Sequence, residues 1–500
     1  MKKLLCLLLA LFFVLSLAAC GGDGKDTTPS DTKPVDTKPS NGRDEIEDSV
    51  PTDLNYADQS DNTVTFFVRS NGDILPYEIC CEELMNDTLR DAIHYRNIDV
   101  ENRLGVKIKQ VAQDGAYGPH VAWFEVLSTA VNTNSSDYDA AAIYTTYGAP
   151  YALQNLYYNL NDVSVQNGDG YIDLEKPWWN QSIIEDCTMY DVLYFLCGDL
   201  SVSGTSGAHL IWFNKDLFNQ KFPDEDFNAL YDYVDKGTWT IARMTDYASQ
   251  VWDDMNSSGT VDDGDVVGFR SVLSTGAYMD SWIYAMGINI LDRDTYGDYS
   301  LANFGSRMVP AFERVKGLYE SEGSLIGTGK IDEGLTNLGA GNVLFVDGSV
   351  NDGSAFRNST VNYGCLPMPK YDAEQEEYGN AMWTYTSLMV LLNNLSDDRA
   401  KMVSAVLELL AAESYKQVTP AYYSKVITGQ YSKDEADARM FDIVLNTCRY
   451  SFESVYSQRL GGIMQIFRSL DADVQNKIDT NKDVWPTKLT ELLEGLEALS

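Results

Sequence analysis

Residues 254–265, in the middle of the chain, have the spacing of a calcium-binding loop. Oxygen-bearing side chains stand at loop positions 1, 3, 5, 9 and 12, a glycine at position 6 and an aliphatic residue at position 8. Calcium takes hard oxygen ligands, and glycine allows the sharp turn between them. The ligands would come from Asp254, Asn256, Ser258, Thr260 through its carbonyl, Asp262 and Asp265. The pattern predicts a structural calcium ion, and the alternative is an acidic surface turn.

A group of aromatic residues lies at or near expected strand ends or in connecting segments, where burial alone does not require rings. Its members are Tyr144, Tyr147, Trp178, Trp179, Tyr278, Trp282, Trp383 and Tyr385. Sugars present flat C–H faces that stack on such rings, and hydroxyls that need carboxylates and amides at the rim. For any single ring the alternative is core packing. As a group, we expect some of them to line a carbohydrate-binding cleft.

Other kinds of site find little support in the sequence. The three histidines, His94, His120 and His209, share no metal-ligand spacing, and no phosphate-binding loop of the ATPase type is present. Cys187 and Cys197 flank an expected hairpin and could form a disulfide, with buried free thiols as the alternative. Six cysteines lie beyond the expected signal peptide and lipidation residue, namely Cys80, Cys81, Cys187, Cys197, Cys365 and Cys448. No two of them have the spacing of a zinc or redox motif.

The N-terminus has the features of an export signal. Lys2 and Lys3 precede an apolar run over residues 4–17, which is too short to span a membrane comfortably. The run ends in Leu-Ala-Ala-Cys-Gly at residues 17–21, which resembles the bacterial lipobox. We therefore expect a signal peptide at 1–19 and a lipid, such as palmitate, on Cys20. The alternative is an ordinary secreted protein that is cleaved near Ala19 without lipidation.

Residues 20–55 read as a flexible tether. The segment is rich in Asp, Thr, Pro and Ser and repeats Asp-Thr-Lys-Pro at 31–34 and 36–39. Such a composition buries nothing and spans on the order of 30–50 Å. It would hold a globular domain away from the outer face of the cell membrane.

Composition limits the function further. The chain has 500 residues, with 37 Lys and Arg against 74 Asp and Glu, a formal charge of −37. This charge disfavours nucleic acid as a partner and leaves no basic patch for a membrane surface. With 44% hydrophobic and 12% aromatic residues, the chain has enough material for a packed core. Its length indicates two or more lobes.

The pattern after the tether alternates strands and helices. Strands are expected at 63–69, 106–111 and 138–144, with helices at 83–103 and 123–132 between them and a loop at 145–148. This is βαβ order, in which ligands bind beyond the carboxyl ends of the strands. Farther along, strands are expected at 211–214, 342–346 and 387–392, and helices at 244–254, 309–322, 330–338 and 397–413.

Several segments in a fixed order carry a family resemblance. They are the lipobox, Tyr138-Asp139, Pro-Trp-Trp-Asn at 177–180, Trp-Phe-Asn-Lys-Asp-Leu-Phe at 212–218, Gly-Thr-Trp-Thr at 237–240, Leu-Pro-Met-Pro-Lys-Tyr at 366–371 and the stretch 413–423. The chain resembles the extracellular solute-binding lipoproteins (family 1) of bacterial carbohydrate ABC transporters, a branch that includes maltodextrin- and alginate-oligosaccharide-binding proteins. Some relatives carry a calcium loop in a comparable place.

The resemblance implies an α/β, two-lobed periplasmic-binding-protein-like fold of type II, with interleaved lobes. Residues 56–207 and 384–420 would form lobe 1, and residues 208–383 and 421–500 lobe 2. Ligand contacts would come from the loop after Tyr144, from Asp199, from the region of Tyr278 and Trp282, from Asp347 and Ser349, and from Trp383 and Tyr385. Hinge closure around a sugar would precede docking onto membrane permease subunits.

Function is therefore expected to be carbohydrate capture for an ABC importer, by a monomeric protein that is not an enzyme. The alternatives are an extracellular carbohydrate-active enzyme, which would need a suitably spaced carboxylate pair, and a surface carbohydrate-binding adhesin. The sequence leaves open which sugar is bound, its chain length and which permease is served.

Overall fold

The computed structural model describes residues 42–500 except 73–74, 82–83, 86, 273–275, 328–330, 356–358, 384 and 427–434. The predicted signal peptide, the lipidation residue Cys20 and the tether up to residue 41 lie outside the described residues. Residues 42–500 form one compact unit. Within the described part of the chain, every helix is too short or too polar to cross a membrane.

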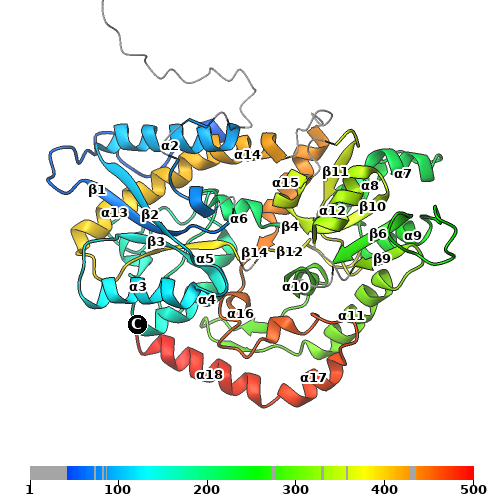
Figure 1. Ribbon diagram of the computed structural model, residues 1–500. Coiled ribbons are helices and arrows are strands. Elements are labelled where there is room, and N and C mark those ends of the chain that lie inside the picture. The colour runs from blue at the N-terminus through cyan, green and yellow to red at the C-terminus, as the bar shows by residue number, and fades with distance from the viewer. Residues whose placement is uncertain are drawn as a thin grey trace, which may run out of the picture. The chain divides into compact units, whose positions relative to one another are not determined.

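Two separate sheets organise this unit (Figure 1). The first has the order β13-β3-β1-β2. Its strands are β1 (Thr63–Arg69), β2 (Lys107–Gln113), β3 (Ala140–Tyr144) and β13 (Ser387–Leu391). β1 pairs in parallel with β2 and β3, whereas β13 pairs antiparallel with β3. Because β3 and β13 are buried along their whole length, both read as continuous apolar runs.

Long helices cover this first sheet, and we call the sheet together with these helices the first lobe. The helices of this lobe are α2 (Thr88–Leu104), α3 (His120–Asn132), α4 (Thr145–Gly148), α5 (Gln181–Cys187), α6 (Val202–Ser206), α13 (Asp397–Glu413) and α14 (Thr419–Val426), with the shorter turns η1 (Arg43–Glu45), η2 (Leu75–Tyr77), η3 (Ala149–Gln154), η4 (Leu160–Val163) and η6 (Ser414–Val418). α2 is capped at its N-terminus by Asp87, whose carboxylate accepts from the Arg90 amide, and at its C-terminus by Gly105 with φ 66°. Arg399 of α13 forms two 2.7 Å hydrogen bonds to Asp139 and so fixes α13 to the start of β3.

The second sheet has the order β11-β4-β10-β6-β5, with β9 added beside β6. Its strands are β4 (His209–Asn214), β5 (Trp252–Asp253), β6 (Val266–Val272), β9 (Ser324–Gly327), β10 (Val343–Ser349) and β11 (Tyr363–Leu366). β10 is parallel to β6 and antiparallel to β4. We call this sheet and its helices the second lobe. The helices are α7 (Lys215–Lys221), α8 (Asn228–Asp235), α9 (Ile241–Ser249), α10 (Gly276–Ala285), α11 (Gly305–Tyr319), α12 (Ile331–Ala340), η5 (Val350–Ala355) and α15 (Glu435–Asn446).

The chain passes between the two sheets more than once. Residues 207–208 lead from α6 to β4, and residues 382–386 lead back from β12 (Asn380–Ala381) to β13. These two crossings touch, because the Trp383 amide donates to the Gly207 carbonyl at 2.9 Å and a Cβ on Gly207 would come 2.4 Å from Thr386 Cγ2. Only a glycine fits this close approach.

The C-terminal segment runs across both lobes. β14 (Cys448–Arg449) pairs with β12, and α16 (Phe452–Val455), η7 (Ile463–Gln465), α17 (Val474–Asn481) and α18 (Val484–Glu497) follow. α16 packs on α4 and α5 of the first lobe, whereas α17 packs on α11 of the second. α18 touches both η3 and β8 (Tyr299–Leu301), the partner of β7 (Leu291–Arg293) in a hairpin. Figure 1 shows α17 and α18 following one another along the bottom of the view, below the two sheets.

The structure corrects several expectations from the sequence. Residues 145–148 form the short helix α4 instead of a loop. The helix expected at 244–254 ends at Ser249, because Trp252 and Asp253 pair with β6 as strand β5. Part of the expected tether belongs to the compact unit, since Val50 is buried and Asp48 pairs with Arg103 at 2.7 Å. The strands expected at 63–69 and 387–392 and the helix at 397–413 are confirmed.

Candidate functional site

A cluster of rings and one arginine lies where the first sheet ends. β1 ends at Arg69 and β3 ends at Tyr144, both at the carboxyl end of parallel strands. Tyr147 follows on α4, and the second crossing brings Trp383 and Tyr385 to the same place. We call these five residues the strand-end cluster. Its position is the one at which open α/β sheets bind ligands.

Within the strand-end cluster, Tyr144 packs edge-on against two other tyrosine rings. The ring centres of Tyr144 and Tyr147 are 4.8 Å apart, and those of Tyr144 and Tyr385 are 5.1 Å apart, with the ring planes nearly perpendicular in both pairs. Trp383 lies 5.3 Å from Tyr385. Tyr147, Trp383 and Tyr385 are only partly buried, so part of each ring remains open to a ligand.

The outer edge of the strand-end cluster is formed by α3 and the segment before it. His120 lies 4.3 Å from the Tyr147 ring, and Tyr117 lies 5.7 Å from it. Tyr117 is 68% exposed, which is unusual for a tyrosine that already contacts two aromatic rings. The cluster therefore continues outward as an aromatic surface.

An ion pair from the C-terminal segment and α10 lies beside this cluster. Arg468 holds Asp280 with both Nε and Nη2, at 2.9 Å and 2.5 Å. Burial raises the pKa of Asp280 to about 6, and the hydrogen bond and charge of Arg468 act in the opposite direction. The charge of Arg468 also acts on the hydroxyls of Tyr144 and Tyr147. A ligand in the strand-end cluster would thus meet a partly exposed cation at its rim, fixed in place by a buried carboxylate.

Behind Arg69, a buried carboxyl organises the approach of α6. Glu78 accepts hydrogen bonds from the hydroxyls of Ser201 and Ser203 and from the Ser203 amide. Burial raises the pKa of Glu78, whereas the two serines and the charge of Arg69 lower it. Ser203 in turn accepts from the Ser387 amide at 2.9 Å, which joins α6 to the start of β13.

In the second lobe, the predicted residues Asp347 and Ser349 lie at the carboxyl end of β10 and Tyr278 and Trp282 lie on α10, all four buried. Asp347 accepts from Ser271 and Tyr319, both at 2.7 Å, and burial raises its pKa to about 6. These contacts give Asp347 a structural role.

Two of these four residues, Tyr278 and Ser349, are held by Asp352 on η5. Tyr278 donates to Asp352 at 2.7 Å, and the Ser349 amide donates to the same oxygen at 2.6 Å. Trp282 donates to the Tyr319 hydroxyl at 3.1 Å and has no exposed surface. Trp282 is therefore a core residue in this structure.

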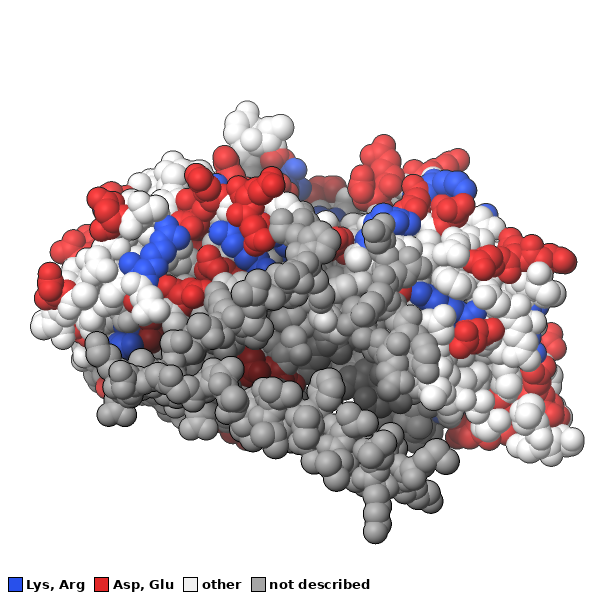
Figure 2. Space-filling view, turned by 90° about the horizontal axis from the view of Figure 1, so that it is seen from above, with Lys and Arg blue, Asp and Glu red and all other residues white. Residues whose placement is uncertain are grey.

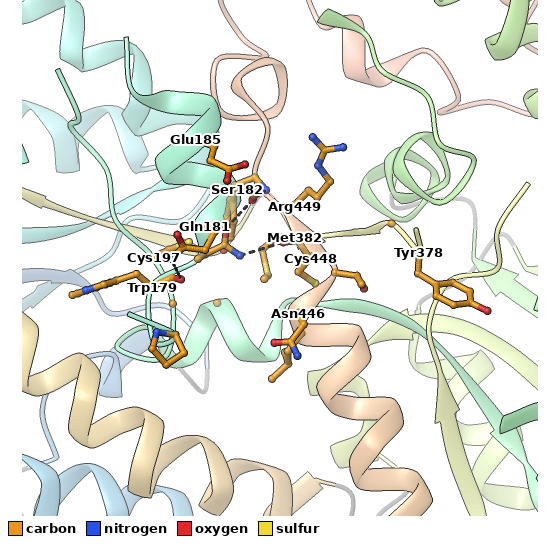
Figure 3. Close-up of a pocket in the computed structure, with 18 of the residues that line it drawn as sticks. Trp179, Gln181, Ser182, Glu185, Cys197, Tyr378, Met382, Asn446, Cys448 and Arg449 are labelled. Carbon is orange, nitrogen blue, oxygen red and sulfur yellow. Dashed lines mark hydrogen bonds between the residues drawn. The ribbon is translucent and has the colours of Figure 1, made fainter. Parts of the chain in front are cut away.

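A cavity of about 780 Å³ lies beside the crossings and contains no member of the strand-end cluster. Figure 3 shows Trp179, Gln181 and Ser182 on one side of it and Tyr378 on the other. Its volume is in the range of small-molecule sites. However, the predicted residues Trp178 and Trp179 are 0% and 2% exposed, so neither presents a ring face for stacking.

Asp199, the remaining predicted ligand residue, lines this cavity. It accepts from the Thr419 hydroxyl and lies 3.9 Å from Arg43. Burial raises the pKa of Asp199 to about 6, and these two partners lower it. Because Trp178 and Trp179 are closed to stacking here, whereas Tyr147, Trp383 and Tyr385 are partly exposed, the cavity is a weaker candidate for sugar binding than the strand-end cluster.

The expected calcium loop lies outside both regions, between β5 and β6. Asp254 accepts from the amides of Ser258 and Gly259, and Asp265 accepts from the Met255 amide and Trp252. Asn256 donates to Asp262 at 2.8 Å. Among the described residues, no group of three or more His, Cys, Asp or Glu side chains is placed to hold a metal ion. The calcium ligand set therefore stays a prediction.

The six described cysteines are all buried, and Cys187 and Cys197 are free thiols. Burial raises the pKa of both thiols well above the ordinary value. The structure thus has the buried thiols that were the alternative to a disulfide. The expected tight turn between them is present, with Tyr190 and Asp191 at positive φ and Met189 bridged to Val192.

Sequence reasoning missed the charged members of the site. Arg69 could have been found as the last residue of an expected strand, at the end where ligands bind. Arg468 and Asp280 had no such signal, because they are 188 residues apart and meet only through the fold.

No family model matches the chain, and no curated protein matches it. Among solved structures, a cyclo/maltodextrin-binding protein complexed with maltotetraose is similar over 89% of this chain and 98% of its own, with 11% identity and a TM-score of 0.53. The GacH receptor of Streptomyces glaucescens has 13% identity, coverages of 88% and 98%, and a TM-score of 0.49. An ABC substrate-binding protein from Listeria monocytogenes in complex with cycloalternan has 12% identity, coverages of 88% and 99%, and a TM-score of 0.49.

The first of these likenesses extends over nearly all of both chains and shows the fold. The protein has the two-lobed, periplasmic-binding-protein-like α/β architecture, and the fold class expected from the sequence is confirmed. At 11% identity the likeness carries the fold alone.

Proposed function

We propose that this protein is the carbohydrate-binding subunit of a bacterial ABC importer. The observation that carries the proposal is the strand-end cluster, where Tyr144 and Tyr385 cover the Arg69 guanidinium and Tyr147 and Trp383 adjoin these two rings. Tyr147, Trp383 and Tyr385 offer partly open rings to sugar faces, and the partly exposed Arg468, held by Asp280, offers a donor to hydroxyls.

Three further considerations support this proposal. The protein of the same fold with a TM-score of 0.53 is a cyclo/maltodextrin-binding protein complexed with maltotetraose. The sequence motifs at 212–218, 237–240 and 366–371 follow the order of the solute-binding lipoproteins. The N-terminal signal and lipobox, with Cys20 as the lipidated residue, would place the domain on the outer face of the cell membrane.

Several of these motifs have structural tasks in the second lobe. Asn214 caps α7 by accepting from the Leu217 amide at 3.0 Å, and Lys215 forms a buried 2.7 Å ion pair with Asp437. Thr240 caps α9, and Trp239 donates to the Pro367 carbonyl at 2.9 Å. The motifs thus support the resemblance through the fold, whereas ligand choice depends on other residues.

The mechanism we propose is closure of the lobes around a sugar that is held by the strand-end cluster. The touching crossings at Gly207 and Trp383 are short and would absorb the rotation. Closure would bring Arg468, held by Asp280, against the sugar stacked on Tyr147 and Trp383. The closed form would then dock on the permease, and a ligand that binds the closed form better shifts the population toward it.

A thermal-shift screen tests this function. The chain from residue 20 onward, with Cys20→Ser, is mixed with mono- and oligosaccharides and, as controls, with amino acids and peptides. A sugar at a hundred times its Kd should stabilise the folded state by about 2.7 kcal/mol. A shift with a sugar recovered unchanged supports the importer subunit. Flat curves for all sugars would contradict it, and release of a product would favour a carbohydrate-active enzyme instead.

A further inference from the structure

Tyr117 is an exposed ring at the outer edge of the strand-end cluster. The side chain is 68% exposed, although its ring lies 5.7 Å from that of Tyr147 and 6.0 Å from that of His120. Among the large hydrophobic side chains that are exposed in the described part of the chain, Tyr117 and Tyr296 are the two aromatic ones. Scattered apolar side chains are ordinary on a protein surface, but Tyr117 extends a group of rings that already forms a candidate site.

The segment that carries Tyr117 is packed against the cluster. A Cβ on Gly115 would come 2.6 Å from Arg69 Cγ, so a glycine is what lets the segment pass this close over Arg69. The Gly115 amide donates to Asn71 at 3.3 Å, and the His120 ring hydrogen-bonds to the Tyr117 carbonyl. The exposed ring is therefore held in a defined place at the edge of the cluster.

Two hydrogen-bond acceptors accompany this ring. Because the Tyr117 carbonyl can only accept, Nδ1 of His120 must be the donor, and Nε2 of the neutral imidazole is then an acceptor. The exposed Asp114 carboxylate accepts from the Ala116 amide at 3.0 Å, and its charge acts on the Tyr385 hydroxyl. A ring face with acceptors beside it is the combination that holds a sugar residue, whose hydroxyls donate.

From Tyr117 the rings form a continuous path into the cluster. Successive ring centres are 5.7 Å apart from Tyr117 to Tyr147, 4.8 Å from there to Tyr144, 5.1 Å on to Tyr385 and 5.3 Å on to Trp383. Tyr144 is buried, whereas the other members of the path are partly or mostly exposed. The path thus begins at an open rim and ends at the second crossing, which is the arrangement expected for a chain of sugar residues rather than for a single one.

The charge around the rim favours hydroxyl groups over anions. The chain has a formal charge of −37, and Figure 2 shows acidic side chains on both sides of the face seen from above. Asp114 places a further carboxylate in the same segment as Tyr117. A carboxylate repels an anionic group and accepts from a hydroxyl, so an uncharged sugar residue suits this position.

We propose that Tyr117, His120 and Asp114 form an outer subsite for an uncharged sugar residue, and that the bound oligosaccharide passes over it into solvent. This inference rests on the proposed function, because it extends the same site and sets the kind of chain that binds there. Inner sugar residues would stack on the partly open rings of Tyr147 and Trp383, and an outer one on Tyr117. Because most of Tyr117 faces solvent, the chain can continue past it, and the site would take long chains by one end.

A chain-length series tests the outer subsite. Maltodextrins, cello-oligosaccharides, manno-oligosaccharides and any further linkage that raises Tm in the thermal-shift screen, in members of one to seven sugar residues, are titrated by calorimetry against the chain with Cys20→Ser. In the series that binds, we expect the longest members to bind about fivefold or more tightly than the shortest. Equal affinity along the series, or tightest binding of its shortest members, would overturn the inference and leave carbohydrate capture intact. Binding of no sugar at all would count against the proposed function itself.

Two variants assign the gain in affinity to Tyr117. Tyr117→Ala should remove most of the gain of the long chains and change the affinity of the shortest ones less, whereas Tyr117→Phe keeps the ring and should keep the gain. Tyr296→Ala is the matched control, because it removes the other exposed ring, in the β7–β8 turn outside the cluster. A gain that survives Tyr117→Ala in full overturns the assignment.

A labelled chain gives a second measurement that needs no variant. A long member of the binding series carries a fluorophore on its reducing end in one preparation and on its non-reducing end in another. One of the two should bind as tightly as the unlabelled chain, because its label lies beyond Tyr117 in solvent. Loss of binding with both labels would mean that the chain is enclosed at both ends, which overturns the open outer end.

Discussion

Arg43 donates to the carboxylate of Asp442 at 3.4 Å and so joins the first lobe to the second. Asp442 lies on α15, which packs on β11 in the second sheet. The segment that carries Arg43 is fixed to the first lobe, since its guanidinium also donates to the Tyr415 carbonyl at 3.1 Å and lies 4.3 Å from the Tyr415 ring. Asp48 on the same segment pairs with Arg103 of α2. Arg43 is thus a brace between the lobes beside the crossings.

Removing this brace should shift the balance between lobe arrangements. We expect Arg43→Ala and Asp442→Ala to change sugar affinity in the same direction by no more than about fivefold, because partly exposed ion pairs contribute about 1 kcal/mol or less. The double variant should match Arg43→Ala, because that change already removes the pair with Asp442, whereas Arg43 also contacts Tyr415 and Asp199. Calorimetry gives the affinities and small-angle scattering the lobe arrangement. Arg439→Ala, which breaks a pair within the second lobe, should change neither.

Open rings of the strand-end cluster should dominate the affinity. Tyr147→Ala and Trp383→Ala each remove a stacking surface, and we expect each to weaken sugar binding about five- to thirtyfold, with little change in Tm. Tyr296→Ala is the control, because Tyr296 is 91% exposed in the β7–β8 turn and lies outside the cluster. If Trp179→Ala, at the separate cavity, weakened binding more than both variants in a still folded protein, the site would have been placed wrongly.

Glu408 should make the fold less stable as pH rises. Burial raises its pKa from 4.5 to about 7, although Trp179 and the Asp173 amide donate to it at 3.0 Å and 3.2 Å. A carboxyl whose folded pKa is raised binds its proton more tightly in the folded state. Its favourable contribution is therefore complete below about pH 4.5 and is lost as pH rises through about 7.

Glu408→Gln should remove this dependence. An amide keeps an acceptor for Trp179 and carries no charge, so the variant should be more stable than the parent at pH 8, by up to about 3 kcal/mol, and equal to it near pH 4. Urea unfolding at several pH values measures the difference. The idea fails if the two proteins show parallel stability over pH 4–8. Glu413→Gln, near the end of the same helix, is the control.

Calcium should stabilise the second lobe if residues 254–265 form the predicted loop. After treatment with chelator, addition of millimolar calcium should raise Tm, and Asp254→Asn with Asp262→Asn should abolish the rise. Asp263→Asn is the matched control, because Asp263 occupies no ligand position and pairs with Arg270. An unchanged Tm in the parent protein would identify the segment as an acidic turn.

The cysteines give a check on the packing of both lobes. Because all six described cysteines are buried, a thiol reagent should modify none in the native domain and all six after unfolding, in a chain that carries Cys20→Ser. Four reactive thiols after unfolding would instead indicate one disulfide. In that case the variant pair Cys187→Ser and Cys197→Ser would identify it.

The regular elements follow from local pattern, whereas the site does not. The strand at 63–69 and the helix at 397–413 were predictable because apolar residues recur at the proper period and Ser396 caps the helix. The end of α9 was not predictable, because Trp252 and Asp253 continue the helical pattern in the sequence. They form a strand instead, since they pair with β6 farther along the chain. Long-range pairing overrides local preference there.

The same contrast holds within the candidate site. The rings of Tyr144 and Tyr385 could be suggested from the sequence, since they adjoin apolar strands. Trp178 and Trp282 belong to the same predicted group of aromatic residues and are nevertheless core residues in the described structure. Sequence does not separate these cases, because exposure depends on which distant segment covers a ring. For Trp282 the cover includes Tyr319, whose hydroxyl accepts from its indole.

The return of the chain to the first lobe affects how the protein can fold during synthesis. β13 supplies an outer strand of the first sheet only at residues 387–391, and Gly495 of α18 lies so close to η3 that a Cβ there would be 3.0 Å from Leu153. The first lobe therefore cannot reach its final packing until β13 and almost all of α18 have emerged from the ribosome or the export channel. A ribosome-bound or partly exported chain would expose apolar surface for that whole period, so its yield should depend on chaperones more than that of a protein whose lobes are sequential.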